Sequence, residues 1–423
     1  MSILRYLGYV IRFVARFILF PIYWASGLVP RRKDLWVFGS WGGYRFADNG
    51  AAFFMHCQKV LKDDVELVWI SRKPSIIKQL RNNNLNAHWI WSPRGIGACL
   101  RAGYHIFDCY PKDTNFWLGR GATRINLWSG VPLKVIQRQH DNPLNRHYRL
   151  FHGYPPERWF LSMMMPWHVF KPDLMVATSV ECGEITRFAF GLDKGNVAVT
   201  GYPRNDVLFD ASKSVAAPSS PMPASFVQAV SSNRKVILYL PTYRDSGKAY
   251  MNMDWERLDE LMEKLEATFF FKTHPVDRIK NEISCKNVYQ LPQLIDVYDL
   301  LPQTDILISD YSSIVFDFML LDRPIVYYTP DLKEFLSSSR ALNFHPKEIA
   351  VGPMCEAFPE LLTAIENIIQ SGAADYDGKR KEVFPRLHGF RDGRASERVL
   401  EIISERYFEG ALVSQKEPEI PLV

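Results

Sequence analysis

Short apolar runs alternate with longer amphipathic segments along most of this chain, and this alternation limits its fold more than any other feature. Apolar runs this short are typical of strands that are buried on both faces. Strands that alternate with helical segments form parallel sheets covered by helices. The sequence therefore predicts an α/β fold, with strands at 35–38, 65–70, 104–107, 125–128, 174–177, 197–200, 236–240, 268–271, 306–308 and 325–328.

A chain of 423 residues is too long for one compact core, so we expect two domains. A stretch rich in Pro and Ser at 211–224 interrupts the alternation and is predicted to be an interdomain linker. We predict a Rossmann-like domain at 34–210 and a second at 225–400, between a membrane-associating segment at 1–33 and a tail at 401–423. Two doubly wound domains facing one another would place a cleft between the carboxyl ends of their strands.

The N-terminal segment is apolar, aromatic and free of acidic residues. On a helix, Arg5, Arg12 and Arg16 fall within about 60° of one another and leave a broad apolar face. The uncharged run 17–30 is too short to span a bilayer, and three cations follow it at 31–33. We expect this helix to lie in a membrane interface on the cytoplasmic side, and residues 1–33 to be removable without unfolding the domains. A signal sequence, a tilted span and a buried helix are the alternatives.

Composition excludes several classes of partner. The net charge of +5 is mild, and there is no zinc-finger spacing or basic helix, so we expect no nucleic-acid partner. The six cysteines show no paired spacing and are expected to be reduced thiols rather than metal ligands. The chain has neither a P-loop nor a dinucleotide fingerprint, and we expect neither a metal nor a cofactor.

Polar and cationic side chains follow three predicted strands of the second half. They are Thr242 and Arg244 after 236–240, Lys272 and His274 after 268–271, and Ser309, Asp310, Ser312 and Ser313 after 306–308. A helical pattern starts after the last group, and the N–H groups and dipole of a helix start favour an anion. Because the carboxyl ends of parallel strands share one edge, the pattern favours a ligand containing a diphosphate over an ordinary capped helix.

In their order along the chain, these motifs resemble those of the CDP-glycerol glycerophosphotransferases, which build teichoic acids and related polymers. The resemblance is carried by Gly-Tyr-Pro-Arg-Asn-Asp at 201–206, Leu-Pro-Thr-Tyr-Arg at 240–244, Lys-Thr-His-Pro at 272–275 and Ser-Asp-Tyr-Ser-Ser-Ile-Val-Phe-Asp-Phe at 309–318. It implies a GT-B-like pair of Rossmann domains attached peripherally to the cytoplasmic face of the membrane. The second domain would hold CDP-glycerol or CDP-ribitol, and the first a lipid-linked or polysaccharide acceptor.

The implied reaction is attack of an acceptor hydroxyl on the distal phosphorus of the CDP-alditol, with CMP leaving. The resemblance implies that His274 contacts a phosphate or transfers a proton, since imidazole titrates near neutral pH. The implied donor-binding residues are Thr242, Arg244, Lys272, Ser309, Asp310, Ser312 and Ser313. We expect Arg204 and Asp206 to form a structural bridge at the domain junction.

One departure from the family bears on the catalytic base. The family usually carries Trp-His-Gly where this chain has Trp128, Ser129 and Gly130, and that histidine is the family's proposed base. Serine needs a partner of its own to act as a base at neutral pH. His140, with Asp141 beside it, and Asp48 are the candidates to supply the function. Alternatively, positioning and electrostatics suffice without a base, or activity has been lost.

Two other functions remain open. One is a GT-B glycosyltransferase that uses a nucleotide sugar. The other is a catalytically silent, membrane-bound subunit that binds a nucleotide, which the serine at position 129 would allow.

Overall fold

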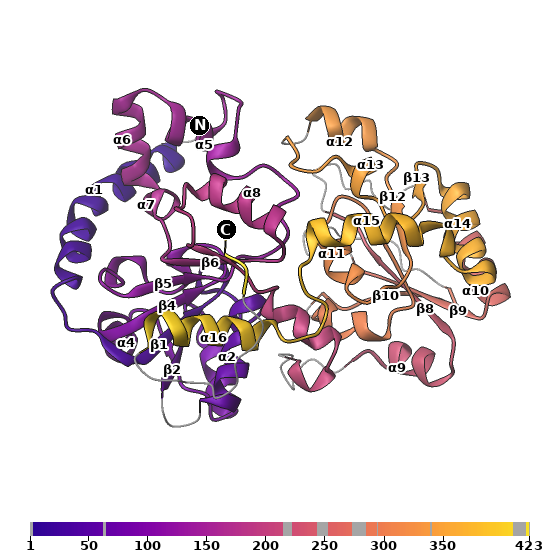
Figure 1. The fold of residues 1–423 in the computed structure, drawn as a ribbon, viewed down its shortest axis with the longest axis horizontal. Helices are drawn as coiled ribbons and strands as arrows, with labels where there is room; N and C mark the ends of the chain where they lie inside the picture. Colours follow the sequence, from indigo (N-terminus) through magenta and orange to yellow (C-terminus); the bar gives the residue numbers. More distant parts are fainter. Residues whose placement is uncertain are drawn as a thin grey trace. The chain divides into compact units, whose positions relative to one another are not determined.

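The computed structural model describes residues 3–61, 65–214, 222–242, 253–272, 285–293, 295–338, 341–408 and 420–422, with the backbone alone at 3–10, 12 and 336–338. The chain forms two compact units (Figure 1). Unit 1 comprises Met1–Asp206 together with Asp392–Val423, and unit 2 comprises Val207–Arg391. Each unit has its own parallel sheet, so the predicted α/β class with two parallel-sheet domains is confirmed.

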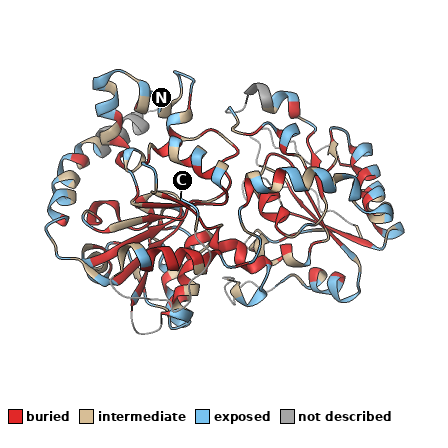
Figure 2. Cartoon of the chain, in the orientation of Figure 1, coloured by how far each residue is buried: buried red, intermediate tan, exposed pale blue. Residues whose placement is uncertain are grey.

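The sheet of unit 1 has the order β3-β2-β1-β4-β5-β6-β7 in the described residues, and every neighbouring pair is parallel. Alternate residues of β1 face opposite helices: Val37 lies in a cluster with residues of α4, whereas the Phe38 ring contacts the rings of Phe53 and Phe54 on α2. The strands consist mostly of buried residues, as Figure 2 shows, with the edge strand β3 the least covered. They are β1 Arg32–Gly39, β2 Glu66–Ser71, β3 Ala87–Trp89, β4 Ala102–Phe107, β5 Thr123–Asn126, β6 Leu174–Ala177 and β7 Val197–Val199.

The end of the chain returns to unit 1, which moves the predicted boundaries. The helix α16 belongs to unit 1 and not to the second domain predicted at 225–400. The carboxylate of Asp206 accepts hydrogen bonds from the backbone of Ala395 and Ser396 at 2.9 Å each and so caps this helix. The predicted tail 401–423 is helical up to Tyr407, and Leu422 forms a bridge with Ala198. The helices of unit 1 are α1 Ile3–Ser26, α2 Asp48–Val60, α3 Pro74–Asn82, α4 Pro93–Arg101, α5 Arg146–His152, α6 Pro155–Met164, α7 Pro166–Val169, α8 Val180–Phe190 and α16 Ala395–Tyr407.

The N-terminal helix α1 is docked on unit 1 along one side. Arg16, expected on a charged outer face, is buried; its guanidinium lies 4.9 Å from the Trp117 ring centroid and 5.2 Å from that of Trp167. The side chains of Arg5 and Arg12 lie outside the described residues. Across the described chain, none of the helices combines the length and the apolar character needed to cross a membrane.

Removal of residues 1–33 would damage unit 1, contrary to the expectation from sequence. Arg31 is half-buried and donates to the carbonyls of Ser26, Cys99, Leu118 and Arg120. The strand β1 begins one residue later, so the deletion would also remove its first two residues. The sequence pattern misplaced this boundary because three consecutive cations after an apolar helix look like residues beside anionic lipid, whereas Arg31 binds carbonyl groups of unit 1.

The sheet of unit 2 has the order β10-β9-β8-β11-β12-β13 in the described residues. Its strands are β8 Lys235–Leu240, β9 Ala267–Phe271, β10 Val288–Gln290, β11 Ile306–Ser309, β12 Ile325–Tyr328 and β13 Met354–Cys355. Its helices are α9 Ala224–Ser231, α10 Trp255–Lys264, α11 Ile314–Met319, α12 Leu332–Ser338, α13 Pro346–Ile349, α14 Phe358–Ser371 and α15 Asp377–Leu387. Residues 215–221 of the predicted linker lie outside the described residues.

Candidate functional site

Three neighbouring strands of unit 2 end at one edge of its sheet, as the sequence predicted. β8 lies between β9 and β11, and both pairs are parallel, with Ser309 opposite Leu240 and Phe271 opposite Tyr239. The residues that directly follow these strand ends therefore emerge at the same edge.

Asp310 clamps the segment that follows β8. Its carboxylate accepts hydrogen bonds from the Thr242 backbone N–H at 2.9 Å and from the Thr242 hydroxyl at 2.5 Å. Asp310 is buried, as is Ser309, whose hydroxyl donates to the Leu240 carbonyl at 2.6 Å. These contacts hold two neighbouring strand ends together at the edge where the donor site is predicted.

The helix start after β11 is formed as the sequence predicted. Ser313 is the N-cap residue of α11, and the Ser312 hydroxyl accepts from the Ile314 N–H at 3.4 Å. Both serines are half-buried, whereas every residue of α11 is buried. The two serines thus lie at the surface end of a buried strand-to-helix junction.

Lys272 is the cation that the structure describes at this edge. Its ammonium group donates to the Ile295 carbonyl at 2.6 Å, and the residue is half-buried. His274 and Arg244, the predicted proton-transfer and phosphate-binding residues, lie outside the described residues.

In unit 1, Asp48 lies at the carboxyl edge of the sheet and is held by two side chains. Its carboxylate is 2.7 Å from the Arg204 guanidinium and accepts from the Trp41 indole N–H at 3.0 Å. The backbone of Asp48 has a φ of 65°, that of Trp41 48° and that of Trp128 53°. Such angles are strained for residues with a side chain, and strain of this kind gathers at functional sites.

A buried carboxylate, Asp108, lies behind Asp48 and was missed from the sequence. It accepts hydrogen bonds from the Ser40 hydroxyl and the Gly50 N–H. A Cβ atom at Gly50 would lie 2.9 Å from Asp108, so the glycine permits this close approach. Burial raises the pKa of Asp108 well above its usual range, and the charges of Asp48 and Asp113 raise it further. The sequence signal that could have identified Asp108 is its position directly after the predicted strand 104–107.

Asp113 organises the neighbouring loops through their backbones. Its carboxylate accepts from the N–H groups of Gly42 at 2.8 Å, Cys109 at 2.8 Å and Tyr110 at 3.3 Å. Burial raises the pKa of Asp113 to about 6, although these hydrogen bonds act in the opposite direction. Two carboxyl groups with raised pKa values thus lie in this region: Asp108, which interacts with Asp48, and Asp113, which interacts with Asp108.

The turn that carries Ser129 is fixed on both sides. Asn49 donates to the Trp128 carbonyl at 2.7 Å, Arg204 to the Ser129 carbonyl at 2.7 Å, and the Tyr202 hydroxyl to the Gly130 carbonyl at 2.9 Å. Burial raises the pKa of the nearby Cys109 thiol well above its usual range, and the Ser129 side chain acts in the opposite direction. Ser129 therefore lies among Asp48, Asn49 and Arg204. Arg204 joins two segments of unit 1, and its expected role together with Asp206 at the domain junction stays a prediction.

Three histidines form a row of rings that reaches toward the same turn. His140 stacks on His147 with centroids 5.3 Å apart, and His147 contacts His168 at 4.9 Å. Tyr110 then links His168 to Trp128, at 4.4 and 6.3 Å. Burial lowers the pKa of His168 to about 3, with contributions from His147, Lys112 and Arg146. In the described part of the chain, no group of three or more His, Cys, Asp or Glu residues is arranged to hold a metal ion.

Two parallel-sheet units with polar clusters at their carboxyl edges define an α/β protein with two parallel-sheet domains. The chain belongs to the CDP-glycerol:poly(glycerophosphate) glycerophosphotransferase family, whose model matches residues 22–405. This confirms the resemblance seen in the motifs and makes the protein a transferase by family.

Individual relatives agree with this assignment. The chain is 27% identical over 358 residues to a teichoic acid poly(glycerol phosphate) polymerase of Bacillus spizizenii, covering 80% of this chain and 84% of the relative. It is 33% identical over 225 residues to a teichoic acid ribitol-phosphate polymerase of Staphylococcus aureus, covering 50% of this chain but only 38% of that relative. The fold is similar to the wall teichoic acid polymerase TagF, with a TM-score of 0.69, 21% identity and coverage of 96% and 98% of the two chains.

Proposed function

We propose that the protein transfers glycerol phosphate or ribitol phosphate from a CDP-alditol to an acceptor hydroxyl of a cell-surface polymer, such as teichoic acid or a capsule, and releases CMP. The observation that carries the proposal is the family match over residues 22–405, together with the shared edge of β9, β8 and β11. The reaction forms a bond between the acceptor oxygen and the distal phosphorus and breaks the bond to the CMP oxygen. The acceptor proton must also be removed.

Unit 2 is proposed to bind the donor diphosphate. Thr242, Lys272, Ser312 and Ser313 stand at or next to the edge where three strands end. Arg244 and His274 are assigned to the same site by the family motifs alone. Cations and N–H donors here would neutralise charge on the diphosphate, and this is the main requirement in phosphoryl transfer.

Unit 1 is proposed to bind the acceptor, with its hydroxyl near Ser129. Asp48 is joined to the Ser129 turn through Arg204, which contacts both residues at 2.7 Å. His140 is farther along the chain of ring contacts, separated from Trp128 by His147, His168 and Tyr110. We therefore place Asp48 before His140 as the group that receives the acceptor proton.

Product analysis tests the proposed reaction. The purified full chain is incubated with CDP-glycerol or CDP-ribitol and with lipid-linked and oligosaccharide acceptors. We expect release of CMP that depends on acceptor and disappears in His274→Ala. No CMP from either donor with any acceptor would overturn the proposal.

The same assay separates the two other functions. Release of UDP, GDP or another nucleoside diphosphate from a panel of nucleotide sugars would identify a glycosyltransferase. Binding of a CDP-alditol without turnover in every acceptor would identify a silent nucleotide-binding subunit.

We also propose peripheral attachment to the cytoplasmic face of a membrane through the outer side of α1. Support comes from large apolar side chains that remain exposed there although the opposite side is docked: Val14 is 55% exposed, Phe17 56%, Ile18 65% and Trp24 58%. Burial of such side chains in an interface is favourable, and each contributes roughly 1.5–3 kcal/mol when fully removed from water.

Vesicle sedimentation tests this attachment with the full chain. The double variant Phe17→Ser and Ile18→Ser should lose binding to phosphatidylglycerol vesicles. Phe188→Ser, which changes a side chain that is 64% exposed on α8, serves as the matched control and should bind like the parent. Equal sedimentation of all three proteins would refute a role for α1.

A further inference from the structure

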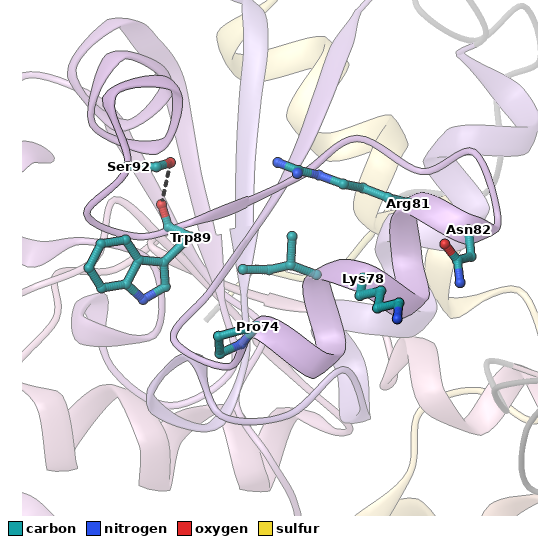
Figure 3. Close-up of a pocket in the computed structure, with 7 residues that line it drawn as sticks. Pro74, Lys78, Arg81, Asn82, Trp89 and Ser92 are labelled. Carbon is teal, nitrogen blue, oxygen red and sulfur yellow. Dashed lines mark hydrogen bonds between the residues drawn. The ribbon is translucent and has the colours of Figure 1, made fainter.

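A pocket of about 430 Å³ opens between α3 and β3 of unit 1, away from the residues assigned above. Ile77 forms an apolar part of its lining, Trp89 stands on one side, and Lys78, Arg81 and Asn82 line the helix side (Figure 3). The Trp89 side chain is 44% exposed. A volume of this size is within the range of small-molecule sites, and the lining combines an exposed ring with two cations.

The polypeptide around this pocket is uniformly cationic. The stretch 71–101 contains six cations and no Asp or Glu: Arg72, Lys73, Lys78, Arg81, Arg94 and Arg101. Two of these cations act on His88: its pKa is lowered by burial and then by Arg81 and Arg94, whereas Glu66 acts in the opposite direction. A concave surface with this charge attracts anions, and its charges can speed their arrival.

Arg81 is oriented toward the β3 segment that carries Trp89, as Figure 3 shows. Its Nε donates to the Ala87 carbonyl at 2.8 Å, and one terminal nitrogen hydrogen-bonds to His88 Nδ1 at 2.9 Å. A guanidinium has five N–H donors, so these two bonds fix its direction and leave donors for a ligand. Lys78, one turn earlier on α3, is exposed.

The pocket is linked along the carboxyl edge of the sheet to the proposed acceptor site. Trp89 pairs with Ser71 at the end of β2, and the Ser71 hydroxyl donates to the Gly43 carbonyl at 2.9 Å. The loop of Gly43 also carries Trp41, which donates to Asp48. Since β3 is two strands from β1, the pocket lies about 10 Å along the edge from the end of β1.

Exposed rings and cations continue along this connection. Trp41 is 46% exposed, and the Arg45 guanidinium lies 5.4 Å from its ring centroid. Arg72 is fixed by donating to the Gly42 carbonyl at 2.8 Å. An extended polyanion with apolar carbons between its charges could bind along the path from Asp48 to Trp89. Its charges would contact the cations, and its carbons would contact the exposed rings.

We propose that the α3–β3 pocket is a subsite for the already assembled part of an anionic alditol-phosphate acceptor. A phosphate of the acceptor contacts Lys78 and Arg81, and the adjoining alditol or sugar carbons lie on the Trp89 ring. The assignment rests on the proposed transferase function for the identity of the ligand. The pocket is concave and contains a ring that a flat lipid headgroup surface does not require, so it fits a polymer segment better than a membrane.

Direct binding tests the subsite without turnover. Titration calorimetry of the full chain with synthetic glycerol phosphate oligomers should show binding that weakens about tenfold or more in Lys78→Glu. Lys194→Glu is the matched control, because Lys194 is also exposed on unit 1 but precedes β7 at the opposite edge of the sheet. It should bind as the parent does. Trp89→Ala should weaken oligomer binding but leave polyphosphate of equal charge unaffected, since polyphosphate has no carbons for the ring.

Acceptor length provides a second, kinetic test. Lys78→Glu should raise the KM for a long acceptor about tenfold and leave the KM values for CDP-glycerol and for a one-unit acceptor unchanged. A merely structural role for Lys78 would change all three values together and would overturn the proposal.

The remaining outcomes separate this inference from the function on which it rests. Oligomer binding lost in Lys78→Glu, with no CMP released from any donor, would support an anion subsite and contradict the transferase. CMP release with oligomer binding and KM values unaffected by Lys78→Glu and Trp89→Ala would support the transferase and overturn the subsite. If Lys78→Glu loses binding to phosphatidylglycerol vesicles but still binds the oligomers like the parent, the pocket would be assigned to a membrane and the proposal would be overturned.

Discussion

Arg204 and Asp48 form an ion pair at 2.7 Å in which each side chain is only 7% exposed. They are far apart in the sequence, and Arg204 also donates to the Ser129 carbonyl at 2.7 Å. The Arg204 guanidinium thus holds Asp48, which is a candidate base, and the turn at Ser129, where the family usually carries a histidine.

Loss of this pair should be costly to stability. Arg204→Met leaves the buried Asp48 carboxylate unpaired, and we expect the free energy of unfolding to fall by about 3–5 kcal/mol in urea denaturation. Arg187→Met breaks an exposed pair with Glu184 and is the control, with an expected change of about 0.5 kcal/mol. Similar decreases in the free energy of unfolding in both variants would show that the buried pair contributes no more to stability than the exposed one.

Restoring the family residue should change the pH dependence of turnover. In Ser129→His an imidazole stands on a turn fixed by Asn49, Arg204 and Tyr202. We expect a new ionisation near pH 6.5 in the pH profile of kcat, because that is the usual pKa of histidine. Ser129→Ala should show no such ionisation. A profile that is unchanged by the histidine would place the acceptor hydroxyl elsewhere.

The clamp on Thr242 should affect donor binding as well as stability. Asp310→Ala removes the carboxylate that accepts hydrogen bonds from the Thr242 N–H and hydroxyl, so we expect a loss of about 1–3 kcal/mol in stability and a raised KM for the CDP-alditol. Asp305 accepts from the Val236 N–H at 2.9 Å at the opposite end of the same strands. Asp305→Ala should therefore destabilise unit 2 but leave the donor KM unchanged; a shift in that KM would count against the assigned edge.

The raised pKa of Asp113 gives stability a defined pH dependence. Folding raises this pKa from 3.8 to about 6, so between these values the folded state keeps a proton that the unfolded chain releases. Stability from this group is therefore present below pH 3.8 and is lost as the pH rises through about 6. Asp113→Asn should flatten this part of the stability curve, measured by urea denaturation from pH 4 to 7. Parallel curves for the two proteins would mean that Asp113 is ionised throughout.

Much of the fold followed from the sequence, because short apolar runs and helical spacing are local signals. The strands β3, β10 and β13 were missed because they have only three, three and two residues and, unlike the equally short β7, contain no run of three apolar residues. The boundary was misplaced because Asp206 caps a helix 189 residues later, a contact that no local pattern reveals.

The candidate site was predictable to the same extent. Strand-end residues could be assigned to one edge, since parallel neighbours bring their ends together. Burial of Arg16 and of Asp108 was not predictable. An arginine on an amphipathic helix looks the same beside lipid and beside Trp117, and an Asp after a strand looks the same in a turn and in a buried network.

The return of α16 to unit 1 sets an order in which the protein can be completed during synthesis. Val399, Leu400, Ile402 and Ile403 are buried in unit 1, yet they leave the ribosome after every residue of unit 2. Because chains emerge from the N-terminus and domains fold as units, unit 2 can finish folding while unit 1 still lacks its last helix. The unit that begins first is thus the one that ends last, with the apolar surface that α16 will cover exposed in the interval.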